Sequence, residues 1–207
     1  MEEETVLVPG GRRVEATLSR PSDVDPAALS ACVVACPPHP ELGGNRADPR
    51  LRTVTGGLDE ARIASLCFDY GPWDEGYGER EDARNALRWA AERSEHVAAF
   101  GYSFGAAIAA LAVATIDVEL DGVSLLAPTA TVGDELDAAA TLSDITCPTQ
   151  VVYGDRDTTA AWQPVVEAAR EAGAEVVGLA VDHHFVGQRD KIRRAVVPFL
   201  TDALGVG

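Results

Sequence analysis

Residues 97–111 read VAAFGYSFGAAIAAL, which is an apolar run, a Gly-x-Ser-x-Gly segment and a second apolar run in direct succession. The first run predicts a buried strand and the second predicts a helix. Gly101 and Gly105 allow a sharp turn between the two, because glycine lets neighbouring backbone come close. Such a turn strains Ser103, presents its hydroxyl above the sheet edge, and places the amide of Phe104 at the positive end of the helix. The segment therefore predicts a serine nucleophile beside an amide that can stabilise an oxyanion.

Two other interpretations of this segment compete with a nucleophile. Gly101 and Gly105 could serve only the close packing of strand against helix, with Ser103 as the helix cap. A dinucleotide-binding turn would need glycine in place of Ser103 and an acidic residue at the end of the next strand. Asp121 precedes that strand instead, so the dinucleotide interpretation is discounted.

Short apolar segments alternate with helical patterns along the whole chain. The expected strands are residues 14–18, 31–36, 63–69, 97–101, 122–127, 149–153 and 175–180. The expected helices are residues 50–61, 79–93, 104–115, 160–172 and 190–204. Several strands are apolar throughout, as in a sheet covered on both faces. The pattern predicts one α/β domain over residues 1–207, with a mostly parallel central sheet and helices on both faces.

The connection between the strands at 122–127 and 149–153 is short. It is expected to hold at most one small helix, near residues 134–140. This leaves little material for a lid over the carboxyl edge of the sheet.

The chain is strongly acidic, with 33 Asp and Glu residues against 17 Lys and Arg and a formal net charge of −16. This charge repels nucleic-acid phosphates and anionic lipids, so neither nucleic acid nor a membrane is an expected partner. Lys191 is the only lysine. An acidic chain poor in lysine resembles proteins of a salt-rich cytoplasm, although a GC-rich genome also favours arginine over lysine.

The chain begins with Met1 and three glutamates, where a secretory signal would have basic residues and then an apolar stretch. No apolar run approaches the roughly 20 residues of a membrane-spanning helix, so a cytoplasmic protein is expected. The four cysteines form no C-x-x-C pair and lie in or beside apolar segments. They predict buried free thiols and no metal site.

Carboxylates and imidazoles follow the last two expected strands. Asp155 and Asp157 come after the strand at 149–153, and His183 and His184 come after the strand at 175–180. A serine nucleophile needs a base, and the base needs a group that orients it. The chain supplies these groups in the order Ser, Asp, His, which is the order of the α/β-hydrolase sheet.

From about residue 14 to residue 204 the sequence resembles the α/β-hydrolase superfamily. The segment PPHPELGG at 37–44 is similar to the His-Pro-x-x-Gly-Gly segment of small lidless hydrolases of the dienelactone-hydrolase-like and acyl-peptidase-like type. The segment FDYGPWDEG at 68–76 is similar to the aromatic-Asp-x-x-Gly run that follows the next strand in these proteins. The resemblance implies a single hydrolase domain without a substantial lid.

The resemblance also assigns a role to each residue. It implies Ser103 as the nucleophile and Asp157 as the triad acid, with Asp155 as the alternative acid. It points to His183 as the base, with His184 as the alternative, because either histidine fits the family's pattern. Adjacent side chains point in different directions, so only one of the two can face the serine.

The oxyanion would be held by two backbone amides. One is the amide of Phe104, and the resemblance places the other in the loop after the first core strand, with Glu41 as the first choice and Leu42 as the second. Pro40 is excluded, because proline has no amide hydrogen. The chain departs from the family's pattern at Pro37, where close relatives often have a histidine, and His39 is expected to brace the loop.

These inferences predict a cytoplasmic, halophilic serine hydrolase of the carboxylesterase or thioesterase type, in the EC 3.1 class. It would cleave a small ester or thioester through an acyl-enzyme, without a metal or an organic cofactor. The alternatives are a non-catalytic binding protein with this fold and a related acyltransferase or peptidase. The expected partner is a small-molecule ester-like substrate, and a homodimer is a possible assembly.

Overall fold

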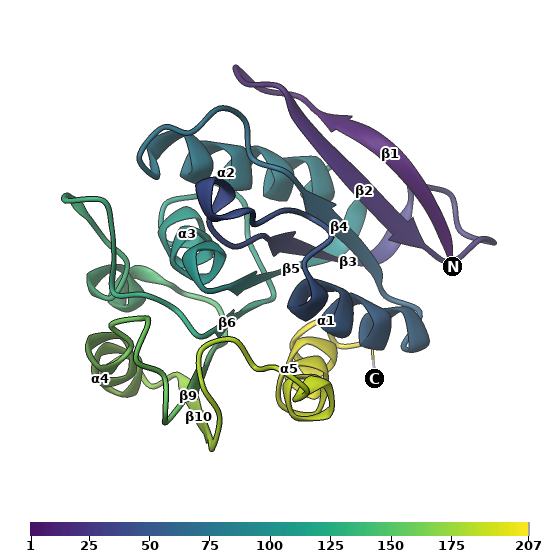
Figure 1. Ribbon diagram of the computed structural model, residues 1–207. Helices are drawn as coiled ribbons and strands as arrows, with labels where there is room; N and C mark the ends of the chain where they lie inside the picture. Colours follow the sequence, from purple (N-terminus) through teal and green to yellow (C-terminus); the bar gives the residue numbers. More distant parts are fainter. Residues whose placement is uncertain (207) are drawn as a thin grey trace.

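The computed structural model describes residues 1–206 and contains a twisted eight-stranded sheet between two layers of helices (Figure 1). The strands of this sheet are β1 (Glu2–Val8), β2 (Val14–Arg20), β3 (Leu29–Cys36), β4 (Ala64–Phe68), β5 (Ser94–Tyr102), β6 (Gly122–Leu126), β9 (Thr149–Gly154) and β10 (Glu175–Leu179). The helices are α1 (Pro49–Glu60), α2 (Tyr77–Ala91), α3 (Phe104–Val113), α4 (Gln163–Glu171) and α5 (Arg189–Ala203). A short hairpin, β7 (Thr131–Val132) and β8 (Leu136–Asp137), and two 3-10 turns, η1 (Pro40–Leu42) and η2 (Ala140–Asp144), complete the order.

The sheet is parallel over most of its width. The strand order is β1-β2-β4-β3-β5-β6-β9-β10, and every pair from β4 to β10 is parallel. Only β1 and β2 run antiparallel to their neighbours. The carboxyl ends of β5, β9 and β10 therefore lie at the same edge of the sheet. The mostly parallel α/β fold predicted from the sequence is confirmed.

Each face of the sheet has its own apolar core. Helices α2, α3 and α4 cover one face, while α1 and α5 pack side by side on the other (Figure 1). Helix α3 is buried along its whole length, because it packs on β5 and β6 beside α2 and is also in contact with β7 and η2. This burial explains why its sequence is apolar on every side.

Strand β1 was not predicted from the sequence. It pairs with β2 from Glu2 to Val8 and forms the edge of the sheet. Its side chains alternate between exposed and more buried ones, the latter being Glu4, Val6 and Val8. The alternation of polar and apolar residues that would predict a strand is absent at its start, because the first three residues are all glutamates. An edge strand with charged residues is a common way to prevent pairing with another chain.

The prediction of a small helix near residues 134–140 is wrong. The structure has the β7–β8 hairpin there, followed by η2. Gly133 adopts a φ of 57°, which allows the reversal of the chain, and the buried side chains of Val132 and Leu136 pack on the core beside α3. This hairpin and η2 are the only ordered elements between β6 and β9, so the domain has no substantial lid.

Candidate active site

Ser103 occupies the turn between β5 and α3 in a strained backbone conformation. Its φ and ψ are 57° and −121°, and its amide donates to the carbonyl of Leu126 at the end of β6, at 2.8 Å. A Cβ on Gly101 would lie 2.2 Å from the carbonyl oxygen of Gly105, and one on Gly105 would lie 2.2 Å from that of Cys36. Both glycines are therefore required by close backbone contacts, and the turn holds the serine hydroxyl above the sheet edge.

Three side chains from three strand ends form one hydrogen-bonded line. The Oγ of Ser103 lies 2.9 Å from Nε2 of His183, and Nδ1 of His183 lies 2.6 Å from Oδ2 of Asp157. Asp157 and His183 are buried, while Ser103 is half-buried and so reachable from solvent. A hydroxyl, an imidazole and a carboxylate in this order can move a proton away from the hydroxyl.

The loop after β9 fixes the carboxylate of Asp157. Its Oδ1 accepts hydrogen bonds from the amides of Thr159, at 2.8 Å, and Ala160, at 3.0 Å. Its other oxygen is thereby directed to the imidazole. Asp155, the alternative acid, is exposed and its carboxylate faces the guanidinium of Arg156 at 3.7 Å. The structure places Asp157, not Asp155, beside the histidine.

The loop after β10 fixes His183. The carboxylate of Asp182 accepts the amides of His184 and Phe185, at 3.0 and 3.1 Å, and the buried Phe185 adopts a φ of 51°. The hydroxyl of Tyr102 donates to the carbonyl of His183 at 3.0 Å. Burial raises the pKa of Tyr102 to about 12, so the hydroxyl stays protonated as a donor. His184 is exposed and has no contact with the serine among the hydrogen bonds of residues 1–206.

Aromatic side chains surround the first residue of α3. The ring of His39 lies between Trp73, at a centroid distance of 4.5 Å, and Phe104, at 4.7 Å. Tyr70 contacts the ring of Phe104 edge-on at 5.7 Å and donates its hydroxyl to the carbonyl of Pro37 at 3.1 Å. The loop after β3 and the loop after β4 are therefore packed together against the start of α3. This agrees with the loop-bracing role expected for His39.

The amides of the loop after β3 differ in their availability. The amide of Leu42 donates to the carbonyl of His39 at 3.1 Å, inside η1, and the Leu42 side chain is 85% exposed. Glu41 is exposed in the same turn. The amide of His39 has no acceptor within residues 1–206, and its ring contacts Phe104. The amides of His39 and Glu41 are thus both unpaired in the described chain, and the sequence of the loop could not show this because it carries no information on backbone hydrogen bonds.

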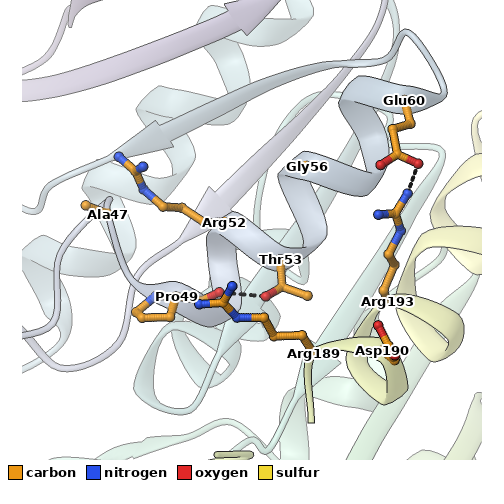
Figure 2. Close-up of a pocket in the computed structure, with 9 residues that line it drawn as sticks. All are labelled: Ala47, Pro49, Arg52, Thr53, Gly56, Glu60, Arg189, Asp190 and Arg193. Atoms are coloured by element: carbon orange, nitrogen blue, oxygen red, sulfur yellow. Dashed lines mark hydrogen bonds and ion pairs between the residues drawn. The ribbon is translucent and has the colours of Figure 1, made fainter. Parts of the chain in front are cut away.

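A depression of about 520 Å³ lies elsewhere, between α1 and α5 (Figure 2). Arg52 extends to one side of α1, while Arg193 reaches from α5 to form an ion pair with Glu60 (Figure 2). None of the three hydrogen-bonded side chains lines it. Its arginine side chains point in different directions and do not converge on one point (Figure 2). The depression is therefore a groove between two helices and is separate from the serine site.

Two classes of site are not found in the part of the chain that the structure describes. No group of three or more His, Cys, Asp and Glu side chains within residues 1–206 is arranged to hold a metal ion. Within the same range, no helix has the length and apolar character needed to cross a membrane.

The chain resembles known proteins in its fold and not detectably in its sequence. No protein-family model matches the sequence, and no curated sequence is significantly similar to it. The structure is similar to that of an α/β serine hydrolase homologue from Coxiella burnetii, with a TM-score of 0.78 and 25% identity over 97% of this chain and 98% of that one. It is also similar to an α/β serine hydrolase without a lid from Xanthomonas campestris, with a TM-score of 0.76 and 22% identity over 96% and 95%. The chain has the lidless α/β-hydrolase fold.

The α/β-hydrolase fold accounts for the placement of the three side chains. It puts the nucleophile turn after a central strand and the acid and base on loops at the same edge, in the order found here. The structure is similar as well to Est1E from Butyrivibrio proteoclasticus, with a TM-score of 0.80 and 16% identity over 98% of this chain and 99% of that one. Est1E has also been solved with ferulic acid bound.

Proposed function

We propose that the protein is a serine hydrolase that cleaves small esters or thioesters through an acyl-enzyme. The observation that carries the proposal is the hydrogen-bonded line from Ser103 through His183 to Asp157. The similarity to proteins named as serine hydrolases and esterases supports it. A half-buried serine without a lid suits a substrate of modest size.

The chemistry follows from the roles of the three side chains. The ionised carboxylate of Asp157 accepts Nδ1–H of His183, so that Nε2 is free to accept the proton of the Ser103 hydroxyl. The serine oxygen then bonds to the substrate carbonyl carbon, and the imidazolium returns the proton to the leaving alcohol or thiol. Water, activated by the same imidazole, hydrolyses the acyl-enzyme and regenerates the serine.

The negatively charged oxygen of the tetrahedral intermediate needs hydrogen-bond donors, and these must lie on the side of Ser103 that faces away from the imidazole. We place them at the amides of Phe104 and His39. The amide of Leu42 is already used within η1, and Glu41, whose amide also has no acceptor within residues 1–206, is exposed, whereas the ring of His39 packs on Phe104. The Phe104 amide stands at the start of α3, where helix amides have no acceptor of their own. The His39 amide belongs to the loop that the close approach of Gly105 to Cys36 and Pro37 brings against α3. The proposal keeps Phe104 as expected from the sequence and puts His39 in place of the expected second donor, for which Glu41 was the first choice and Leu42 the second.

Labelling with a fluorophosphonate tests the proposed nucleophile. The wild type should form a covalent adduct that peptide mass spectrometry locates at Ser103, and it should hydrolyse p-nitrophenyl acetate and butyrate. Ser103→Ala should lose both properties. Ser143→Ala is the matched control, because Ser143 is an exposed serine in η2 and its loss should change neither.

The opposite outcomes would separate the other functions. A folded wild type that neither reacts with the fluorophosphonate nor hydrolyses esters would favour a non-catalytic binding protein. Labelling at Ser103 together with faster acyl transfer to an added alcohol than to water would favour an acyltransferase.

We further propose that the protein works in a salt-rich cytoplasm, because its net charge of −16 implies repulsion that salt screens. Its thermal unfolding midpoint should rise by at least about 4 °C between 0.1 M and 2 M KCl, roughly 1–2 kcal/mol for a domain of this size. Differential scanning calorimetry in the two solutions measures the change, with an isosmotic sucrose solution as control. A midpoint that sucrose raises as much as KCl would contradict the proposal.

A further inference from the structure

Arg12 enters the protein from the turn between β1 and β2 and reaches two buried carboxylates of α2. Its Nε lies 3.1 Å from Oδ2 of Asp82, and its Nη2 lies 3.4 Å from Oε1 of Glu79. Both carboxylate side chains are fully buried. Burial raises the pKa of Asp82 to about 6, while the amide of Gly71 and the guanidinium of Arg12 oppose the shift. Arg12 is thus the counter-charge of a buried acidic pair.

Two glycines leave the space that the guanidinium occupies. A Cβ on Gly78, in the first turn of α2, would lie 1.2 Å from Nη1 of Arg12. A Cβ on Gly71, in the loop after β4, would lie 2.8 Å from Nε of Arg12. Any larger residue at these positions would displace the arginine. The two glycines, one in the loop and one in the helix, therefore make room for the side chain of Arg12, which comes from a hairpin distant in sequence.

The same three charged groups hold the backbone of the loop after β4. Asp82 accepts the amide of Gly71 at 2.9 Å, and Glu79 accepts the amides of Asp74 and Gly76 at 3.0 and 2.8 Å. Arg12 donates to the carbonyl of Pro72 and lies 3.6 Å from the carboxylate of Asp74. The loop is held on both sides of Trp73.

Trp73 joins this loop to the serine site by direct contacts. The centroid of its ring lies 4.5 Å from that of the His39 ring and 5.7 Å from that of the Phe104 ring. These are the two residues whose amides are proposed to hold the oxyanion. Donors must lie within a few tenths of an ångström of their best positions to stabilise a transition state, so the packing around them matters for the rate.

We propose that Arg12 is a positioning residue for the oxyanion site, acting through the loop after β4 and the ring of Trp73. It touches no reacting atom. The inference rests on the proposed function. It gives the turn between β1 and β2, which is remote in sequence from the serine, a role in catalysis.

The test compares variants by their kcat per reactive site. The concentration of reactive serines is measured by titration with a fluorophosphonate, and the maximal rate with p-nitrophenyl acetate is divided by that concentration to give kcat per reactive site. Arg12→Met should lower this kcat by about 10-fold, because a small displacement of a donor is worth one to two orders of magnitude in rate. Arg12→Lys, which keeps the charge but cannot reach Asp82 and the Pro72 carbonyl together, should lower it by about threefold. Arg13→Met is the control, since Arg13 lies in the same turn, is 79% exposed and pairs only with Glu15 in the described chain.

A purely structural role gives a different result. Loss of stability alone would reduce the number of reactive serines and leave kcat per site within twofold of the wild type, and this would overturn the proposal. If Arg12→Met does not fold, Arg12→Lys decides by the same criterion. If the wild type itself does not react with the fluorophosphonate, the proposed function fails, and with it the basis of this inference.

Discussion

Replacement of His183 by alanine is expected to lower kcat for p-nitrophenyl acetate by about 10⁴- to 10⁶-fold, the range found when a triad base is removed. The imidazole is the only group within hydrogen-bond distance of the Ser103 hydroxyl in the described chain. Without it the serine must be deprotonated by water, and the leaving group has no acid. Initial rates, normalised to folded protein by circular dichroism, measure the effect.

His184→Ala is the matched control for this substitution. His184 is adjacent in sequence and of the same chemistry, but it is exposed and its ring lies edge-on to that of His183 at 5.4 Å. Its removal should leave kcat within about twofold of the wild type. A large loss in His184→Ala with activity retained in His183→Ala would show that the loop rearranges in solution and would reverse the assignment of the base.

The sheet could be predicted from the sequence because its signals are local. The apolar run at 97–101 and the Gly-x-Ser-x-Gly segment specify a strand and a turn within a few residues, and the structure has both. The residues at 134–140 carry no such signal. Their hairpin depends on Gly133 and on burial of Val132 and Leu136 against distant parts of the core, which a helical pattern in a short window does not reveal.

The choice between neighbouring residues in the site could not be made from local patterns. Asp155 and Asp157 stand in the same loop, and the structure separates them through the amides of Thr159 and Ala160, which bind only the second carboxylate. Arg12 was beyond sequence reasoning altogether. Its contacts with α2 span 67 and 70 positions of the chain. Its partners Glu79 and Asp82 are charged residues of the kind that a sequence pattern assigns to the solvated face of a helix, whereas both are fully buried in the structure.

Asp157→Asn is the second substitution with a large expected effect, a loss of about 10⁴-fold in kcat. The reason lies in Oδ1, the carboxylate oxygen of Asp157 that does not face His183. Oδ1 accepts two backbone amides, and an amide group at this position can accept them only through its carbonyl oxygen. Its NH₂ must then face Nδ1 of His183, which lies 2.6 Å from Oδ2 in the native protein.

The imidazole responds to that change by exchanging its tautomer. Nδ1 must accept the hydrogen bond from the new NH₂ group, so the ring proton moves to Nε2, and Nε2 can no longer accept the proton of Ser103. The fold should persist, because the shape and the two amide bonds are kept, and the unfolding midpoint should show this. Asp155→Asn, which changes the exposed carboxylate of the same loop, should retain kcat within about twofold. Retention of more than a tenth of the wild-type kcat in Asp157→Asn would mean that the carboxylate does not set the tautomer, and the base would then be oriented by the Tyr102 hydroxyl and the Asp182 turn alone.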